Sequence, residues 1–250
     1  MNGASRPYLH IGVFPAPQIT RISISDAPRA LDGLRICFVS DVHLRACVSD
    51  AKLNALTRLI DAQKAHLLLL GGDYGEGTPQ CARFFEAIAP LRFPLGTFAV
   101  PGNNDAPEAL ARAAEKAGVR LLVNRSETIS FSDAALEIAG CDDYKYGAPD
   151  TSRLFSASNA YRILVSHFPV PPKCGCDLEL SGHTHGGQFS LFGLNPYSIL
   201  FENEYGIAAI DGVRKVNGVR LIVSRGIGVS RIPMRVGTPP EIILAAFDRK

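Results

Sequence analysis

The sequence predicts an α/β fold in a single globular domain. Short apolar runs typical of buried strands alternate along the chain with segments whose apolar residues recur at helical spacing. With 250 residues, 46% of them apolar and 20% charged, the chain is long enough to bury a substantial core. We therefore expect one domain over residues 1–250, on which residues 1–33 pack as an N-terminal extension.

The overall composition argues against several classes of function. The 26 basic and 24 acidic residues leave a net charge of +2, which creates no broad positive field and argues against nucleic-acid binding. A small phosphate-containing substrate remains compatible with this charge. The six cysteines are expected to be reduced, because a chain with a large core needs no disulfides. The chain shows no signal peptide and no apolar run of roughly 18 residues, so we expect a cytoplasmic protein.

The strands and helices are expected in a regular order. Residues 19–24 alternate between apolar and polar and predict an edge strand. Further strands are expected at residues 34–39, 67–70, 97–100, 121–123, 135–139, 161–165, 178–180, 208–210, 220–223 and 241–244. Helices are expected at residues 50–65 with Asp50 as the N-cap, at 81–89, and from Pro107 to Gly118.

Potential metal ligands follow the first buried strand. Asp41 and His43 come directly after residues 34–39, and alternate side chains of an extended backbone face the same way. Functional groups of open α/β sheets collect beyond the carboxyl ends of strands, so these two residues are candidates to bind one cation. The alternative is that Asp41 is a turn or helix-capping residue.

Two further strands end in the same way. Asp73 follows the strand at residues 67–70, behind two glycines that clear space around its carboxylate. The strand at residues 97–100 opens into the segment P-G-N-N-D, which contains Asn103. An asparagine amide oxygen is a neutral hard ligand, although a plain strand-to-helix loop explains this residue too.

The last two of these strand ends carry histidines. His167 ends the strand at residues 161–165, and His183 and His185 lie in the segment G-H-T-H-G-G-Q after residues 178–180. On extended backbone both imidazoles of that segment face one site, and imidazole is the commonest metal ligand in proteins. The alternative is a pair of surface or hydrogen-bonded histidines beside a glycine turn.

Four of the six histidines therefore lie at strand ends beside carboxylates, which scattered core or surface histidines would not do. The motifs D-x-H, G-D, G-N-x-D, a lone histidine after a strand, and G-H-T-H-G-G-Q, in that order, resemble those of the calcineurin-like metallophosphoesterase family. The resemblance runs from about residue 34 to the end of the chain. The G-H-T-H-G-G-Q form and the closing S-R-G-I-G and E-I-I-L are most similar to a bacterial branch of phosphohydrolases.

This resemblance implies a four-layer α-β-β-α sandwich, in which two mixed sheets pack face to face with helices outside. It also implies a centre with two divalent metal ions. The first would be held by Asp41, His43 and His185, the second by Asn103, His167 and His183, and Asp73 would bridge them. Oxygen and imidazole donors together suit Mn, Fe, Zn or Co better than Mg or Ca.

The reaction that the resemblance implies is hydrolysis of a phosphodiester or pyrophosphate bond, or of a monoester. It would proceed by in-line attack of a hydroxide that bridges the two metals. Arg225, in the glycine-rich segment S-R-G-I-G, could donate to the substrate phosphate, or it could be a surface or packing residue. Asp105 is expected to orient its neighbours or to cap the following helix.

One position departs from the family pattern. The family commonly has a histidine in G-N-H-D, where it is thought to help protonate the leaving group, and this chain has Asn104 there. An amide can hydrogen-bond a phosphate oxygen but has no titratable proton near neutral pH. We therefore expect a preference for substrates with good leaving groups, such as nucleotide phosphates or aryl esters.

Two other functions and association with a membrane are alternative interpretations of the sequence. A noncatalytic scaffold would use the fold only to bind a partner, but every expected metal position holds a competent ligand. The near-neutral charge and the absence of a stripe of aromatic and basic residues argue against a nuclease. Association with a membrane surface would rest on residues 191–194 and 197–201, which an ordinary buried loop explains equally well.

Overall fold

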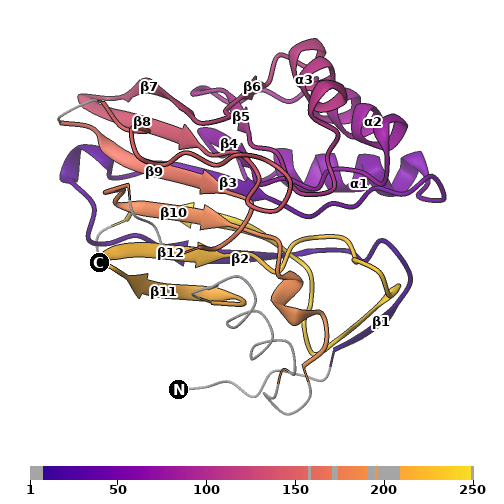
Figure 1. Cartoon of the computed structure of the whole chain (residues 1–250). Helices are drawn as coiled ribbons and strands as arrows, with labels where there is room; N and C mark the ends of the chain where they lie inside the picture. The colour runs from indigo at the N-terminus through magenta and orange to yellow at the C-terminus, as the bar shows by residue number, and fades with distance from the viewer. Residues whose placement is uncertain (1–7, 157–158, 171–173, 191–194, 196–208, 249–250) are drawn as a thin grey trace.

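The chain folds around two six-stranded sheets (Figure 1). The computed structural model describes residues 8–156, 159–170, 174–190, 195 and 209–248. The first sheet has the order β2 (Gln18–Ser23), β14 (Glu241–Ala246), β3 (Arg35–Val39), β4 (Leu67–Leu70), β5 (Thr97–Ala99) and β6 (Arg120–Leu121). Strands β3 to β6 run parallel, and β14 pairs antiparallel with β3, so the sheet is mixed.

The second sheet is mixed as well. Its order is β11 (Gly212–Val216), β12 (Val219–Val223), β10 (Leu178–Ser181), β9 (Tyr161–Ser166), β8 (Ala134–Gly140) and β7 (Arg125–Phe131). The four central strands run parallel, and the edge strands β11 and β7 pair antiparallel with their neighbours. A separate two-stranded ribbon joins β1 (Leu9–Ile11) to β13 (Met234–Val236).

The two sheets pack face to face across an apolar core. Phe38 and Leu69 of the first sheet belong to the same buried cluster as Ile163 and Leu180 of the second, and all four are 0% exposed. In each of these strands the residue two positions away, such as Ile36 or Leu178, belongs to the same cluster, as the pleat of a sheet requires. The prediction of two mixed sheets packed face to face is confirmed.

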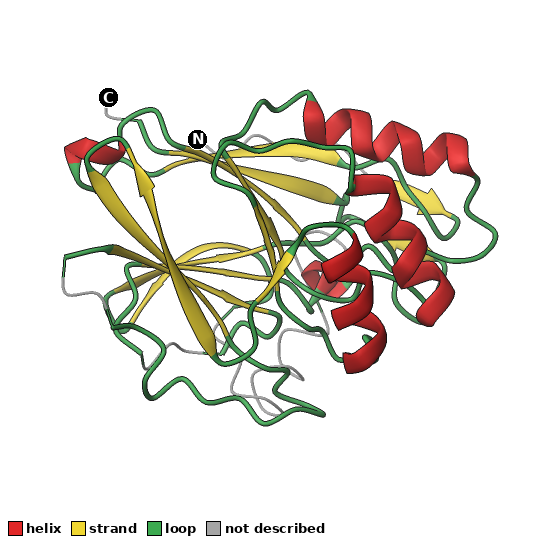
Figure 2. Cartoon of the chain, turned by 90° about the horizontal axis from the view of Figure 1, so that it is seen from above, coloured by secondary structure: helices red, strands yellow, loops and turns green. Residues whose placement is uncertain are grey.

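The helices cover the outer face of the first sheet. Figure 2 shows α1 (Asp50–Asp61), α2 (Thr78–Ile88) and α3 (Pro107–Lys116) on one side of the molecule. Leu53, Phe84 and Leu110 of these helices pack against the opposite face of β3 and β4. On the outer face of the second sheet, within the described residues, loop side chains such as Leu154 and Cys176 take the place of an α-helix.

The first helix differs from its predicted bounds at both ends. Ser49, not Asp50, is the N-cap, and its hydroxyl accepts a hydrogen bond from the backbone N–H of Lys52. The helix ends at Asp61, before the predicted residue 65. Lys64 has a φ of 46°, in the left-handed region, and this backbone turn leads the chain into β4.

Apart from β1 and β13 of the separate ribbon, the strands that the apolar runs missed are polar edge strands. Both β7 and β11 have exposed or half-buried side chains along much of their length, so no apolar run marks them. Of the strand predicted at residues 208–210, the two described residues lie outside any strand, and β11 begins at Gly212. The candidate membrane-facing residues 191–194 and 197–201 lie outside the described residues.

The N-terminal segment joins the first sheet. The predicted edge strand at residues 19–24 is confirmed as β2, which pairs in parallel with β14. That the whole chain forms one domain stays a prediction. Within the part of the chain that the structure describes, no helix is both long and apolar enough to cross a membrane.

The contact between the sheets predicts a large effect of shortening Leu180. Leu180→Ala should lower the free energy of unfolding by about 2–5 kcal/mol, because it leaves a cavity between two rigid sheets. Leu9→Ala is the matched control, since Leu9 is 65% exposed, and it should change stability by less than about 0.5 kcal/mol. Urea denaturation of both variants measures the difference, and equal effects would contradict the assigned core.

Candidate metal centre

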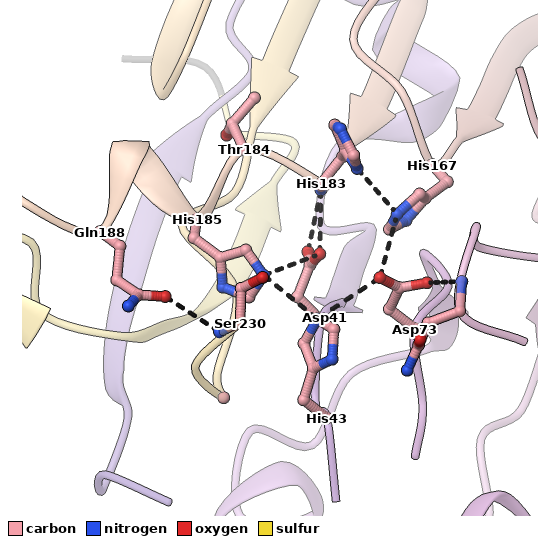
Figure 3. A network of polar contacts seen from close by, with 12 residues as sticks. Asp41, His43, Asp73, His167, His183, Thr184, His185, Gln188 and Ser230 are labelled. Atoms are coloured by element: carbon pink, nitrogen blue, oxygen red, sulfur yellow. Dashed lines mark hydrogen bonds and ion pairs between the residues drawn. The ribbon is translucent and has the colours of Figure 1, made fainter. Parts of the chain in front are cut away.

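The carboxyl ends of strands from both sheets meet at one place. The loops after β3, β4 and β5 of the first sheet lie beside the loops after β9 and β10 of the second. Figure 3 shows the converging side chains of Asp41, His43, Asp73, His167, His183 and His185. The predicted ligands brought together there are Asp41, His43, Asp73, Asn103, His167, His183 and His185. Each comes from the strand end at which the sequence places it.

One group of donors surrounds Asp41. A carboxylate oxygen of Asp41 and one ring nitrogen each of His43 and His185 lie within 4.8 Å of one another. The two imidazole Nε2 atoms are 3.1 Å apart, and His185 Nε2 is 3.6 Å from Asp41 Oδ1. All three residues are buried, so these donors face each other rather than water.

A second group surrounds His167. Its Nε2 lies 3.2 Å from Asn103 Oδ1 and 3.3 Å from His183 Nδ1. Asp73 Oδ2 is 3.5 Å from this nitrogen and also 3.4 Å from His43 Nε2 in the other group. Asp73 therefore lies between the two groups.

The backbone brings these side chains together in a way that differs from the prediction. Asp41, His43, Asp73, His183 and His185 all have φ between 42° and 70°, in the left-handed region. Such a conformation is rare outside glycine and costs of order 1–3 kcal/mol per residue. The expected convergence is present, but the premise of alternating, extended backbone is wrong, because the chain turns at five of the seven donors.

Glycines make the close approach possible. A Cβ on Gly182 would lie 2.3 Å from Asp41 Oδ2, and one on Gly102 would lie 2.2 Å from Asp73 Oδ1. Next to Gly182, the backbone N–H of His183 donates to the Asp41 carboxylate at 3.0 Å. A side chain at either glycine would displace a candidate ligand.

Burial and charge set the protonation of the centre. Burial raises the pKa of Asp41 above its usual value. Burial acts in the same direction on Asp73, but the charge and hydrogen bond of His167 outweigh it and lower its pKa. Burial alone would lower the pKa of His167, yet the charge of Asp73 raises it to about 10. The pKa values of His183 and His185 fall well below normal, mainly through burial, which keeps both imidazoles neutral.

Asp105 holds the loop that carries Asp73. Its carboxylate accepts hydrogen bonds from the backbone N–H groups of Asp73 at 2.8 Å, Gly102 at 2.9 Å and Tyr74 at 3.1 Å. The alternative prediction that Asp105 caps the following helix is wrong, because the N-cap of α3 is Ala106 and it has no side-chain cap. Asp105 has the contacts of an orienting residue.

Two residues that support the candidate ligands were not predicted from the sequence. Glu76 Oε1 lies 2.7 Å from His43 Nδ1, a contact that its position three residues after Asp73 could have suggested. Arg235 is 0% exposed, and its guanidinium donates to the carbonyl oxygens of Gly228 and His185. Arg235 lies fifty residues beyond His185 in the sequence, and no local pattern marks it.

Of the two predicted substrate-binding residues, Asn104 lies beside the candidate ligands and Arg225 pairs with another residue. Asn104 is exposed, and its backbone N–H donates to Asp73 Oδ1 at 2.8 Å. Arg225 is ion-paired with Glu241 and also contacts Thr20. Among the described contacts, the Arg225 guanidinium is not joined to the cluster, which favours the packing alternative for this residue.

Comparison with known proteins agrees with this geometry. The family model of the calcineurin-like phosphoesterases matches residues 34–187, the span that carries all of the converging donors. The chain belongs to the calcineurin-like phosphoesterase family. It is therefore a metallophosphoesterase, a hydrolase of phosphoric esters.

Relatives match this metallophosphoesterase over most of their length. An uncharacterized metallophosphoesterase of Aquifex aeolicus is 30% identical over 87% of this chain and 86% of its own length. The uncharacterized metallophosphoesterase YkuE of Bacillus subtilis is 29% identical, with 88% and 81% covered. The phosphodiesterase YaeI of Escherichia coli is 27% identical, with 84% and 80% covered.

The contacts of Asp105 predict that it controls metal retention without touching the metal. Asp105→Asn keeps the size of the side chain but turns an NH₂ group towards backbone N–H donors, so the Asp73 loop should loosen. We expect metal affinity to fall about 10- to 100-fold, measured by calorimetric titration with Mn²⁺. Glu108→Gln, at the exposed start of α3, is the control and should bind Mn²⁺ like the wild type. Unchanged affinity in Asp105→Asn would show that the loop keeps its shape without these bonds.

Proposed function

We propose that this metallophosphoesterase uses two divalent metal ions to cleave a phosphodiester or pyrophosphate bond of a small phosphate-containing substrate. The observation that carries the proposal is the position of Asp73, whose Oδ2 lies 3.5 Å from His167 Nε2 and 3.4 Å from His43 Nε2. A carboxylate placed between two separate sets of donors suits a bridging ligand.

The donor set fits such a pair of ions. Two buried carboxylates stand among imidazoles, and a divalent cation compensates the buried negative charge. The first ion would be held by Asp41, His43 and His185, the second by Asn103, His167 and His183, with Asp73 shared. Bound there, two ions would activate water and offset charge on the phosphoryl oxygens. The mixture of nitrogen and oxygen donors suits Mn, Fe, Zn or Co.

The chain itself would orient the substrate. Asn104 is exposed beside the donors, and the hydrogen bond from its backbone to Asp73 fixes its position. Its amide can donate to a phosphoryl oxygen but cannot protonate the leaving group. A leaving group that departs as a stable anion, such as a phosphate or an aryl oxide, then needs no acid.

Two competing functions have less support. A noncatalytic scaffold would not need a complete and buried set of donors. A nuclease would need a basic surface, and the net charge is +2. Donation from Arg225 to the substrate, a cytoplasmic location and association with a membrane surface stay predictions.

Hydrolysis of bis-p-nitrophenyl phosphate with Mn²⁺ tests the proposed function. We expect turnover of this diester to exceed that of p-nitrophenyl phosphate, and Asp73→Ala to abolish both along with metal binding. Asp61→Ala is the matched control, since the half-exposed Asp61 side chain pairs with Lys64 and not with the centre. Wild-type protein that holds two ions and hydrolyses neither ester would contradict the proposal.

The replacement of histidine by Asn104 predicts a selective gain of function. Asn104→His should raise the hydrolysis rate of an alkyl diester, glycerophosphoethanolamine, by a factor on the order of 10², because an imidazolium can protonate an alkoxide. The rate with bis-p-nitrophenyl phosphate should change little, since its leaving group needs no proton. If Asn104→His changes the two hydrolysis rates by the same factor, the hypothesis that this position lacks a general acid is wrong.

A further inference from the structure

The loop after β8 borders the candidate metal centre. β8 and β9 are parallel neighbours with Gly140 opposite Val165, and the next residue, Cys141, donates its N–H to the Val165 carbonyl at 3.4 Å. Their arrowheads point the same way in Figure 1. Residues 141–150 therefore leave the sheet at the edge where β9 delivers His167.

Side-chain hydrogen bonds build this loop. Asp143 Oδ2 accepts from the backbone N–H groups of Lys145 and Tyr146, both at 2.7 Å. Asp142 Oδ2 accepts from the N–H of Ala148 at 2.9 Å. These bonds fix the backbone that presents Lys145, so its side chain starts from a defined position.

Aromatic contacts connect the loop to the group of donors around His167 and His183. The ring of Tyr144 lies 6.3 Å from that of Phe168, centroid to centroid. Phe168 in turn stacks on His183, with centroids 3.7 Å apart and planes 26° apart. The loop therefore rests on the side of the centre that holds His183 and His167.

Lys145 presents a positive charge beside this group. Its side chain is exposed, and within the described chain no carboxylate forms an ion pair with it. Its Nζ lies 5.1 Å from the ring centroid of Tyr146, which is itself 72% exposed. Lys145 directly follows Tyr144, so the loop holds its ammonium on the side of the centre where Phe168 stacks on His183.

We propose that Lys145 binds a second anionic group of the substrate, next to the phosphorus atom that is attacked. The site would then favour substrates with two adjacent phosphoryl groups over isolated phosphodiesters, an inference that rests on the proposed function. An ammonium is a compact charge that binds phosphate oxygens well, and the Tyr146 ring favours its position through a cation–π contact. Lys145 is a binding residue and takes no part in the chemical step.

Anion affinities of the metal-loaded protein test this proposal by a readout other than the rate of hydrolysis. Calorimetric titration with inorganic pyrophosphate should show a roughly tenfold weaker affinity for Lys145→Ala than for wild type, while inorganic phosphate binds both alike. Lys145→Arg keeps the charge and should bind pyrophosphate within about threefold of wild type. Lys215→Ala, on the exposed edge strand β11, is the matched control and should leave both affinities unchanged. Metal content measured after each titration shows that pyrophosphate has not removed the ions.

The outcomes separate the inference from the proposed function. Equal loss of affinity for both anions in Lys145→Ala, or no loss for either, would overturn the role of Lys145 while leaving the hydrolase intact. Wild-type protein that holds its metals but binds neither anion would overturn both. Selective loss for pyrophosphate, recovered in Lys145→Arg, supports the second anionic subsite.

Discussion

The buried carboxylate of Asp73 is the constraint on which the centre depends. Only 3% of this residue is exposed, and a charge removed from water must be compensated nearby. His167 and His43 face one oxygen, and the backbone N–H of Asn104 donates to the other. Asp105 in turn fixes the backbone of Asp73. The loops of both sheets therefore have to meet around a single side chain.

The fold explains how they meet. Parallel strands place their carboxyl ends at one edge, and two sheets packed face to face bring two such edges together. Within the described residues, the α-helices connect the parallel strands of the first sheet, and there they cover its outer face. The rigid interior lets short loops hold left-handed backbone at the donors, a strained conformation that an isolated peptide would not keep.

Much of this arrangement was predictable, and the exceptions have physical causes. Strands such as β4 are buried on both faces, so apolar runs reveal them, and their carboxyl ends mark the candidate ligands. Polar edge strands such as β11 carry no such signal. The left-handed turns at the donors follow from tertiary packing, which residue spacing does not encode. Arg235 contacts His185 only through the folded chain, so sequence alone did not identify it.

The central claim is that two separate sets of donors share Asp73 and hold two ions. Anomalous scattering at the manganese edge, from crystals of the protein grown with Mn²⁺, tests it most directly. The account predicts two peaks about 3.5–4 Å apart, one among Asp41, His43 and His185 and the other among Asn103, His167 and His183, with Asp73 between them. A single peak, or two peaks that do not share Asp73, would contradict it.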